Sequence, residues 1–119
     1  TAIMRTINGD GYPFPEEWTR EVAGLSYDRA PRDPTSTQRQ LAATRAQKYP
    51  ALSDITVPTL VIGGEADPLI KISGSRDTAR AIQGARLLTY PGMGHNLPEE
   101  LWPEIVREIA VVAGLESAA

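Results

Sequence analysis

The chain has 119 residues, of which 41% are hydrophobic and 23% charged, so its length and composition are those of one soluble globular domain. Its net charge is −3, and neither sign gathers into the block that a nucleic-acid or acidic-membrane partner needs. The lack of cysteine excludes disulfides and thiol chemistry, a lone histidine excludes a multi-histidine zinc site, and no apolar run approaches the roughly 18 to 20 residues of a membrane span. We therefore expect a cytoplasmic protein without metal or cofactor.

Residues 1–10 predict the end of a core strand and a turn. The run from Thr1 to Arg5 is apolar enough to end a strand, so the chain is expected to begin inside an element. Residues 8–11 then read Asn-Gly-Asp-Gly, a combination that turns the chain away.

Residues 11–52 predict a two-helix segment. In its first part, apolar residues recur at the i, i+4, i+7 spacing of an amphipathic helix: Trp18, Val22 and Leu25. Asp33-Pro34 predicts the cap and first position of a second helix, which extends over residues 35 to about 49 and is polar and alanine-bearing. Together the two helices have little apolar surface of their own.

Residues 53–119 predict the core of the domain. Residues 59–63 form a short β-branched run bounded by proline and glycine, which indicates a buried strand. Ser73 or Ser75 can cap the helix that follows, and residues 86–90 predict another strand. A helix between two strands implies that the strands are parallel with a right-handed crossover.

A last helix is expected near the C-terminal end. From Pro103 to about Val112, apolar residues fall at helical spacing, and Gly114 ends the pattern. The sequence therefore predicts an α/β fold of about three parallel strands with flanking helices.

Asp67 and His95 are the residues best placed for chemistry. Asp67 comes a few residues after one predicted strand, before Pro68, and His95 follows the next strand. Both positions lie just beyond the carboxyl ends of parallel strands, where open α/β sheets place their functional groups. A lone histidine or an Asp-Pro turn is often only structural. Here, however, the two residues follow consecutive strands in the order Asp then His, and this combination favours the interpretation that they are the acid and the base of a nucleophilic triad.

The segments that carry these two residues resemble a known family. Residues 57–68 read Val-Pro-Thr-Leu-Val-Ile-Gly-Gly-Glu-Ala-Asp-Pro, residues 82–87 read Ile-Gln-Gly-Ala-Arg-Leu, and residues 91–98 read Pro-Gly-Met-Gly-His-Asn-Leu-Pro. They are similar to the C-terminal part of a bacterial α/β-hydrolase, and most similar to the aclacinomycin methylesterase and small-esterase or haloperoxidase-like branch. The resemblance implies that the chain begins with the family's sixth strand, continues through a helical cap at residues 11–52 and ends with its seventh and eighth strands.

The family's nucleophile is absent from this sequence. In the family it is the serine of a G-x-S-x-G elbow, which precedes the sixth strand. None of the serines here has the flanking glycines: Ser26, Ser36, Ser53, Ser73, Ser75 and Ser117. The nucleophile and the oxyanion hole are thus expected upstream of Thr1, and the chain alone is expected to have negligible esterase activity.

The leading hypothesis is the acid–base half of a serine-type hydrolase of small-molecule carboxylic esters, in which Asp67 orients His95 and His95 is the general base. Alternatives are a non-catalytic assembly or binding fragment, and a hydrolase-fold enzyme of other chemistry such as a haloperoxidase or a dehalogenase. Candidates for an apolar substrate wall, each equally compatible with ordinary packing, are Phe14, Trp18, Tyr27 and Leu69.

A partner chain is also expected. If residues 1–5 form the first of three adjacent strands, that strand exposes an unpaired edge, and such edges are prone to strand addition. The partner is expected to be the N-terminal part of the same hydrolase or a second copy of this chain.

Overall fold

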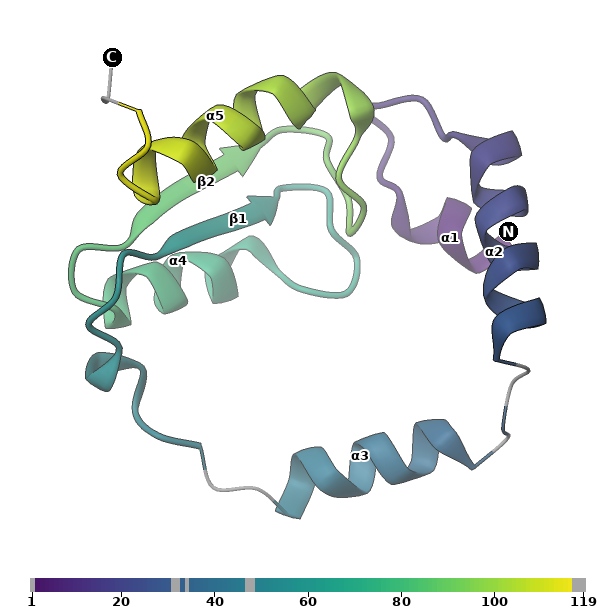
Figure 1. The fold of residues 1–119 in the computed structure, drawn as a ribbon, viewed down its shortest axis with the longest axis horizontal. Coiled ribbons are helices and arrows are strands. Elements are labelled where there is room, and N and C mark those ends of the chain that lie inside the picture. The colour runs from purple at the N-terminus through teal and green to yellow at the C-terminus, as the bar shows by residue number, and fades with distance from the viewer. Residues whose placement is uncertain (1, 31–32, 34, 47–48, 117–119) are drawn as a thin grey trace. The chain divides into compact units, whose positions relative to one another are not determined.

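The computed structural model describes residues 2–30, 33, 35–46 and 49–116. Its regular elements are five α-helices, two strands and two short 3-10 turns among these described residues (Figure 1). They divide into two compact units, one made of Pro15–Pro50 and the other of Ala2–Phe14 together with Ala51–Ala119. Within the described part of the chain, no helix combines the length and apolar character needed to span a membrane.

The second unit contains the sheet. Strands β1 (Leu60–Gly64) and β2 (Arg86–Tyr90) are parallel and paired in register, from Leu60 opposite Arg86 to Gly64 opposite Tyr90. Helix α4 (Ile72–Ala81) forms the crossover between them and packs against both strands. The predicted strand–helix–strand unit is therefore confirmed, with strand bounds within one residue of those expected.

The two faces of this sheet are covered by different helices (Figure 1). On the α4 side, Gly63 lets the helix approach closely, since a Cβ at this position would lie 2.6 Å from the Ser75 hydroxyl oxygen. On the other side lies α5 (Trp102–Val112), which starts with proline at its first turn as predicted. The apolar core forms on the α5 side around the buried side chains of Tyr90, Met93 and Ile105.

The helix caps differ partly from expectation. Helix α4 begins at Ile72 with Lys71 at its N-cap and no side-chain cap bond, so neither Ser73 nor Ser75 caps it. Ser75 is instead a buried helical residue facing the sheet. Gly84 follows the helix with φ of 78°, as expected for a glycine that stops a helix.

The prediction of a strand at residues 1–5 is wrong. Residues Ala2–Ile7 form helix α1, and Thr1 lies outside the described residues. Alanine, methionine and arginine favour helix, and a short apolar run cannot distinguish the two structures by pattern alone. The sheet of the described residues accordingly has two strands instead of about three. Because residues 2–5 are helical, they offer no strand edge of the kind expected.

The first unit consists of helices α2 (Glu16–Arg29) and α3 (Ser36–Ala46), as expected for the two-helix segment. Asp33 accepts hydrogen bonds from the Thr35 N–H and hydroxyl at 2.9 and 2.8 Å, at the turn that precedes α3. The expected extension of α3 through residues 47–48 lies outside the described residues. The apolar stripe of α2 is not buried, because Trp18, Val22 and Leu25 are 56%, 41% and 48% exposed.

Candidate active site

The loops after β1 and β2 begin at the same end of the sheet, because the two strands are parallel (Figure 1). The loops are joined backbone to backbone: the Glu65 N–H donates to the Tyr90 carbonyl at 3.1 Å and the Ala66 N–H to the Met93 carbonyl at 3.0 Å. Gly64 is required at this junction, since a Cβ there would collide with the carbonyl oxygens of Met93 and Gly94. The loops carrying Asp67 and His95 are therefore held against each other.

Asp67 and His95 are in contact. The distance between Nδ1 of His95 and Oδ2 of Asp67 is 2.9 Å. The other carboxylate oxygen, Oδ1, accepts hydrogen bonds from the backbone N–H groups of Leu69 at 2.7 Å and Ile70 at 3.0 Å. Pro68 keeps Asp67 out of a helix, so that the chain folds back and presents these two N–H groups to the carboxylate.

The carboxylate of Asp67 is ionised near neutral pH. Burial raises the pKa of this group, but the hydrogen bond from His95 and those from the N–H groups of Ile70 and Leu69 lower it, and the net pKa lies below the usual value. An ionised carboxylate can only accept hydrogen bonds, so Nδ1 of His95 must carry the proton. Nε2 of the neutral ring then has a free lone pair and can accept a proton.

The two side chains differ in access to solvent. The Asp67 side chain is 8% exposed, whereas the His95 side chain is 44% exposed. A shielded acid next to an accessible imidazole is the arrangement of a proton-accepting pair whose outer nitrogen can reach another molecule or chain segment.

Comparisons with known proteins identify the family of the chain. A family model described as TAP-like protein, of the α/β-hydrolases, matches residues 15–100. The chain belongs to this α/β-hydrolase family. The resemblance inferred from the sequence is thereby confirmed, and with it the fold class of a partial α/β-hydrolase fold.

Relatives of this chain include proteins named as esterases. The chain is 30% identical over 95 residues, 79% of its length, to a rhodomycin D methylesterase of Streptomyces peucetius and equally to one of Streptomyces sp. strain C5. It is 40% identical over 47 residues, 39% of its length, to a non-heme haloperoxidase of Rhodococcus erythropolis. The aligned part spans 32% of each methylesterase and 17% of the haloperoxidase, so the chain corresponds to about a third of the length of the methylesterases it matches.

The predicted substrate residues are divided between the two units. Leu69 lies two residues from Asp67, with its side chain 57% exposed. Phe14 belongs to the same unit and carries the Arg5 guanidinium over its ring, 4.7 Å from the centroid. Trp18 and Tyr27 lie on α2, in the other unit, and are 56% and 63% exposed.

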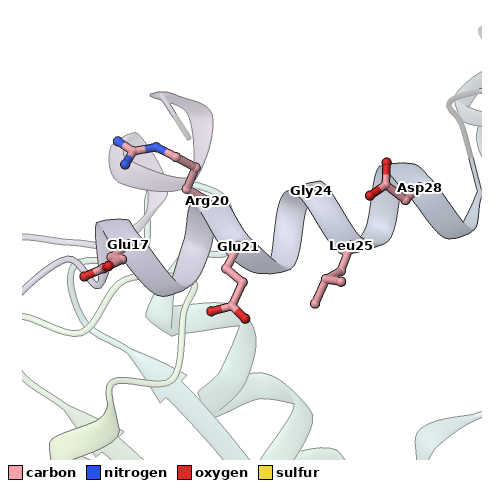
Figure 2. A pocket seen from close by; sticks show the side chains of 6 residues that line it. All are labelled: Glu17, Arg20, Glu21, Gly24, Leu25 and Asp28. Carbon is pink, nitrogen blue, oxygen red and sulfur yellow. The ribbon is translucent and has the colours of Figure 1, made fainter.

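A surface hollow along α2 is not a second site of this hydrolase. Six exposed residues of this helix line it: Glu17, Arg20, Glu21, Gly24, Leu25 and Asp28 (Figure 2). Figure 2 shows their side chains leaving one helix in different directions, so they do not converge on a ligand. The hollow is the open flank of a helix and encloses no space.

Sequence reasoning missed Asn8 and Asn96, which lie beside the pair. Asn8 is 3% exposed, and its Oδ1 accepts a hydrogen bond from Nδ2 of Asn96 at 3.2 Å. The Asn-Gly-Asp-Gly run was interpreted only as a turn leading away. An asparagine that is buried in a glycine-rich turn needs hydrogen-bond partners for both its amide nitrogen and its carbonyl oxygen. This requirement is the one feature that could have indicated that Asn8 has a partner elsewhere in the chain.

Proposed function

We propose that Asp67 and His95 are the acid and the general base of a serine-type hydrolase that acts on carboxylic esters. The observation that carries the proposal is the 2.9 Å contact between Nδ1 of His95 and an Asp67 carboxylate that is oriented by two backbone N–H groups. The membership of the α/β-hydrolases and the methylesterase relatives support the ester class. The nucleophile is proposed to be a serine on chain outside these 119 residues, because no G-x-S-x-G occurs within them.

In this mechanism, Nε2 of His95 takes the proton from the serine hydroxyl as the serine oxygen attacks the ester carbonyl carbon. The negative charge of Asp67 stabilises the imidazolium that forms, and its bond to Nδ1–H holds the ring in the tautomer that leaves Nε2 free. The imidazolium then protonates the departing alkoxide, which leaves an acyl-serine. A water molecule, deprotonated by the same Nε2, hydrolyses the acyl-serine and returns the site to its first state.

The substrate wall remains a proposal built on position. Leu69 is the best placed of the four candidates, because its N–H binds the Asp67 carboxylate while its side chain stays exposed. Phe14 shares the unit that contains the pair. Trp18 and Tyr27 are proposed to contribute through the helical cap, where their exposed rings are available to an apolar ester.

We propose that the segment bearing the nucleophile joins at the free edge of β1. Among the described residues β1 pairs only with β2, so the backbone groups of its other edge lack a strand partner. A sheet of two strands is marginal by itself, and large apolar side chains of the same unit, such as Val106 and Ile109, are 62% and 52% exposed. A second copy of this chain could occupy the same edge, and the complementation test below distinguishes the two partners.

The decisive test is complementation. The chain is mixed or co-expressed with the segment encoded upstream of Thr1, and hydrolysis of a p-nitrophenyl ester is measured. We expect turnover that falls by about five to six orders of magnitude in His95→Ala, as for other triad histidines. Asp77→Asn is a matched control, since Asp77 is an exposed residue of α4 that forms an ion pair with Arg80, its neighbour on the same helix, at 3.0 Å, and it should leave turnover unchanged. If no turnover appears although the two segments associate, the chain is an assembly or binding fragment.

A second chemistry has one observation in its favour. The chain is 40% identical over 47 residues to a protein named non-heme haloperoxidase, a higher identity than the 30% of the longer methylesterase matches. Peroxide-dependent halogenation by the complemented protein, without ester turnover, would assign the chain to this class instead.

A further inference from the structure

The segment after α1 crosses the loop that carries His95. We call residues 7–12 the strap. The Ile7 carbonyl accepts a hydrogen bond from the His95 N–H at 2.7 Å, and the Asn8 carbonyl accepts one from the Gly94 N–H at 2.9 Å. In the other direction, the Gly11 N–H donates to the Gly92 carbonyl at 3.0 Å. The backbone at His95 is thus held from outside the loop itself.

Strap and loop are in direct backbone contact. A Cβ on Gly9 would lie 2.5 Å from the Gly92 oxygen, and a Cβ on Gly11 would lie 2.5 Å from the Gly92 Cα. A Cβ on Gly94 would collide with the backbone of Ile7 and Asn8. No side chain separates the two segments, so a small displacement of the strap is passed directly to the backbone next to the imidazole.

Asn8 fixes the shape of the strap. Its Nδ2 donates to the carbonyl of Tyr12 at 3.0 Å and to that of Gly9 at 3.3 Å, which closes the turn. Its Oδ1 accepts from Nδ2 of Asn96, the residue that follows His95. The side chain of Tyr12 packs against the core cluster of Tyr90 and Met93, so the strap is anchored to the body of the unit.

We propose that Asn8 is a positioning residue for His95. It acts through the backbone: it holds the carbonyls of Ile7 and Asn8 at the places where the N–H groups of His95 and Gly94 need them, and it binds Asn96, the residue that follows the histidine. The proposal rests on the proposed function, in which the His95 ring must stay aligned with Asp67. An exposed ring has few contacts of its own, so its alignment depends on this backbone support.

The rival explanation is that Asn8 is only a buried polar residue that stabilises a turn. Stability measurements alone cannot distinguish the two, because both predict a loss in Asn8→Ala. The tautomer of His95 distinguishes the two explanations. Because the chain has a single histidine, the signals of one imidazole report this tautomer without overlap. The measurement is a long-range ¹H–¹⁵N correlation spectrum of the ¹⁵N-labelled 119-residue chain at a pH high enough to neutralise the ring, together with amide hydrogen exchange.

In the unaltered chain we expect one predominant Nδ1–H form. In Asn8→Ala we expect a several-fold rise of the Nε2–H form, and about tenfold faster exchange of the Gly94 and His95 amides. Thr6→Ala is the matched control, because it removes an exposed hydrogen bond within α1, from the Thr6 hydroxyl to the Ala2 carbonyl. An Asn8→Ala chain that stays folded by circular dichroism, with the tautomer and both amides unchanged, overturns the proposal.

A second variant covers the case in which Asn8→Ala does not fold. Asn96→Ala removes the partner of Asn8 Oδ1 and leaves the donor bonds of Asn8 within the strap intact. We expect the same change of tautomer to a smaller extent, and an unchanged tautomer in this folded variant overturns the proposal equally.

The two proposals fail separately in this design. In the complemented protein, Asn8→Ala is expected to lower kcat about 10- to 100-fold with little change in KM, since misplacement of the base affects the transition state and not substrate binding. If the tautomer shifts as expected but the unaltered complemented protein hydrolyses no ester, the proposed function is wrong and the positioning role stands. If ester turnover depends on His95 but neither the tautomer nor kcat changes in Asn8→Ala, only the positioning role is wrong.

Discussion

Replacing Gly64 by alanine tests whether the junction between the two site loops is as tight as the structure shows. The added methyl group would meet the carbonyl oxygens of Met93 and Gly94, which are backbone atoms and cannot rotate away as a side chain can; the Met93 carbonyl is also held by the Ala66 N–H. Overpacking of this kind costs about 1 to 3 kcal/mol, and contact with two backbone carbonyls of the loop after β2 places Gly64→Ala at or above the upper value. The loops must separate, and the contact between Asp67 and His95 should lengthen with them.

The assay is urea denaturation, with Gly74→Ala as the matched control. Gly74 lies in α4 of the same unit, and the nearest atom to an added Cβ is a side-chain methyl of Ile70 at 3.8 Å, an ordinary contact. This change should raise the free energy of unfolding by about 0.4 to 1 kcal/mol. For Gly64→Ala, with a denaturant slope of about 1 to 3 kcal/mol per molar, the midpoint should fall by roughly 1 to 3 M urea. Equal midpoints for the two variants refute the packing described at Gly64.

Two further predictions concern pH. Folding lowers the pKa of Asp67, so the stabilisation from its hydrogen bonds is present above the unfolded pKa of about 4 and is lost as pH falls through the lower folded pKa. The melting temperature of the unaltered chain should therefore fall on acid titration. The profile of Asp67→Asn should be flatter. Burial and the hydrogen bond to Glu104 raise the pKa of Tyr90 to about 12, so the unfolded chain loses this proton first and stability should fall between about pH 10 and 12. Tyr90→Phe should lack that alkaline loss, and an identical profile in the variant would show that another group is responsible.

Much of the core could be predicted from the sequence, because its signals are local. A short β-branched run between proline and glycine indicated β1, and residues 86–90 indicated β2. A serine cap and the glycine stop at Gly84 indicated α4, although neither serine caps it, and helical spacing indicated α5. Once the strands were taken as parallel, the proximity of Asp67 and His95 followed from topology. The contact of 2.9 Å agrees with that expectation, while the catalytic roles of the two residues stay a prediction.

The errors arose where structure depends on distant partners. Residues 1–5 are equally compatible with a strand or a helix by composition, and a strand needs a neighbour that the local sequence cannot reveal. Asn8 forms its hydrogen bond with a residue 88 positions away, so no local pattern could assign it to the surroundings of His95. The apolar stripe on α2 could be recognised from the sequence. The spacing of its residues indicates that one face of the helix is apolar, but it does not indicate what covers that face.

The division of the chain into two units has a consequence for how hydrolases of this kind can diversify. Among the described residues, the hydrogen bonds that orient the carboxylate, the imidazole and the strap come from residues 2–14 and 51–116, outside α2 and α3. Substitutions in α2 and α3, or their exchange for the helices of a relative, are therefore expected to leave the contact between Asp67 and His95 intact. The two stretches of this polypeptide can diverge at different rates.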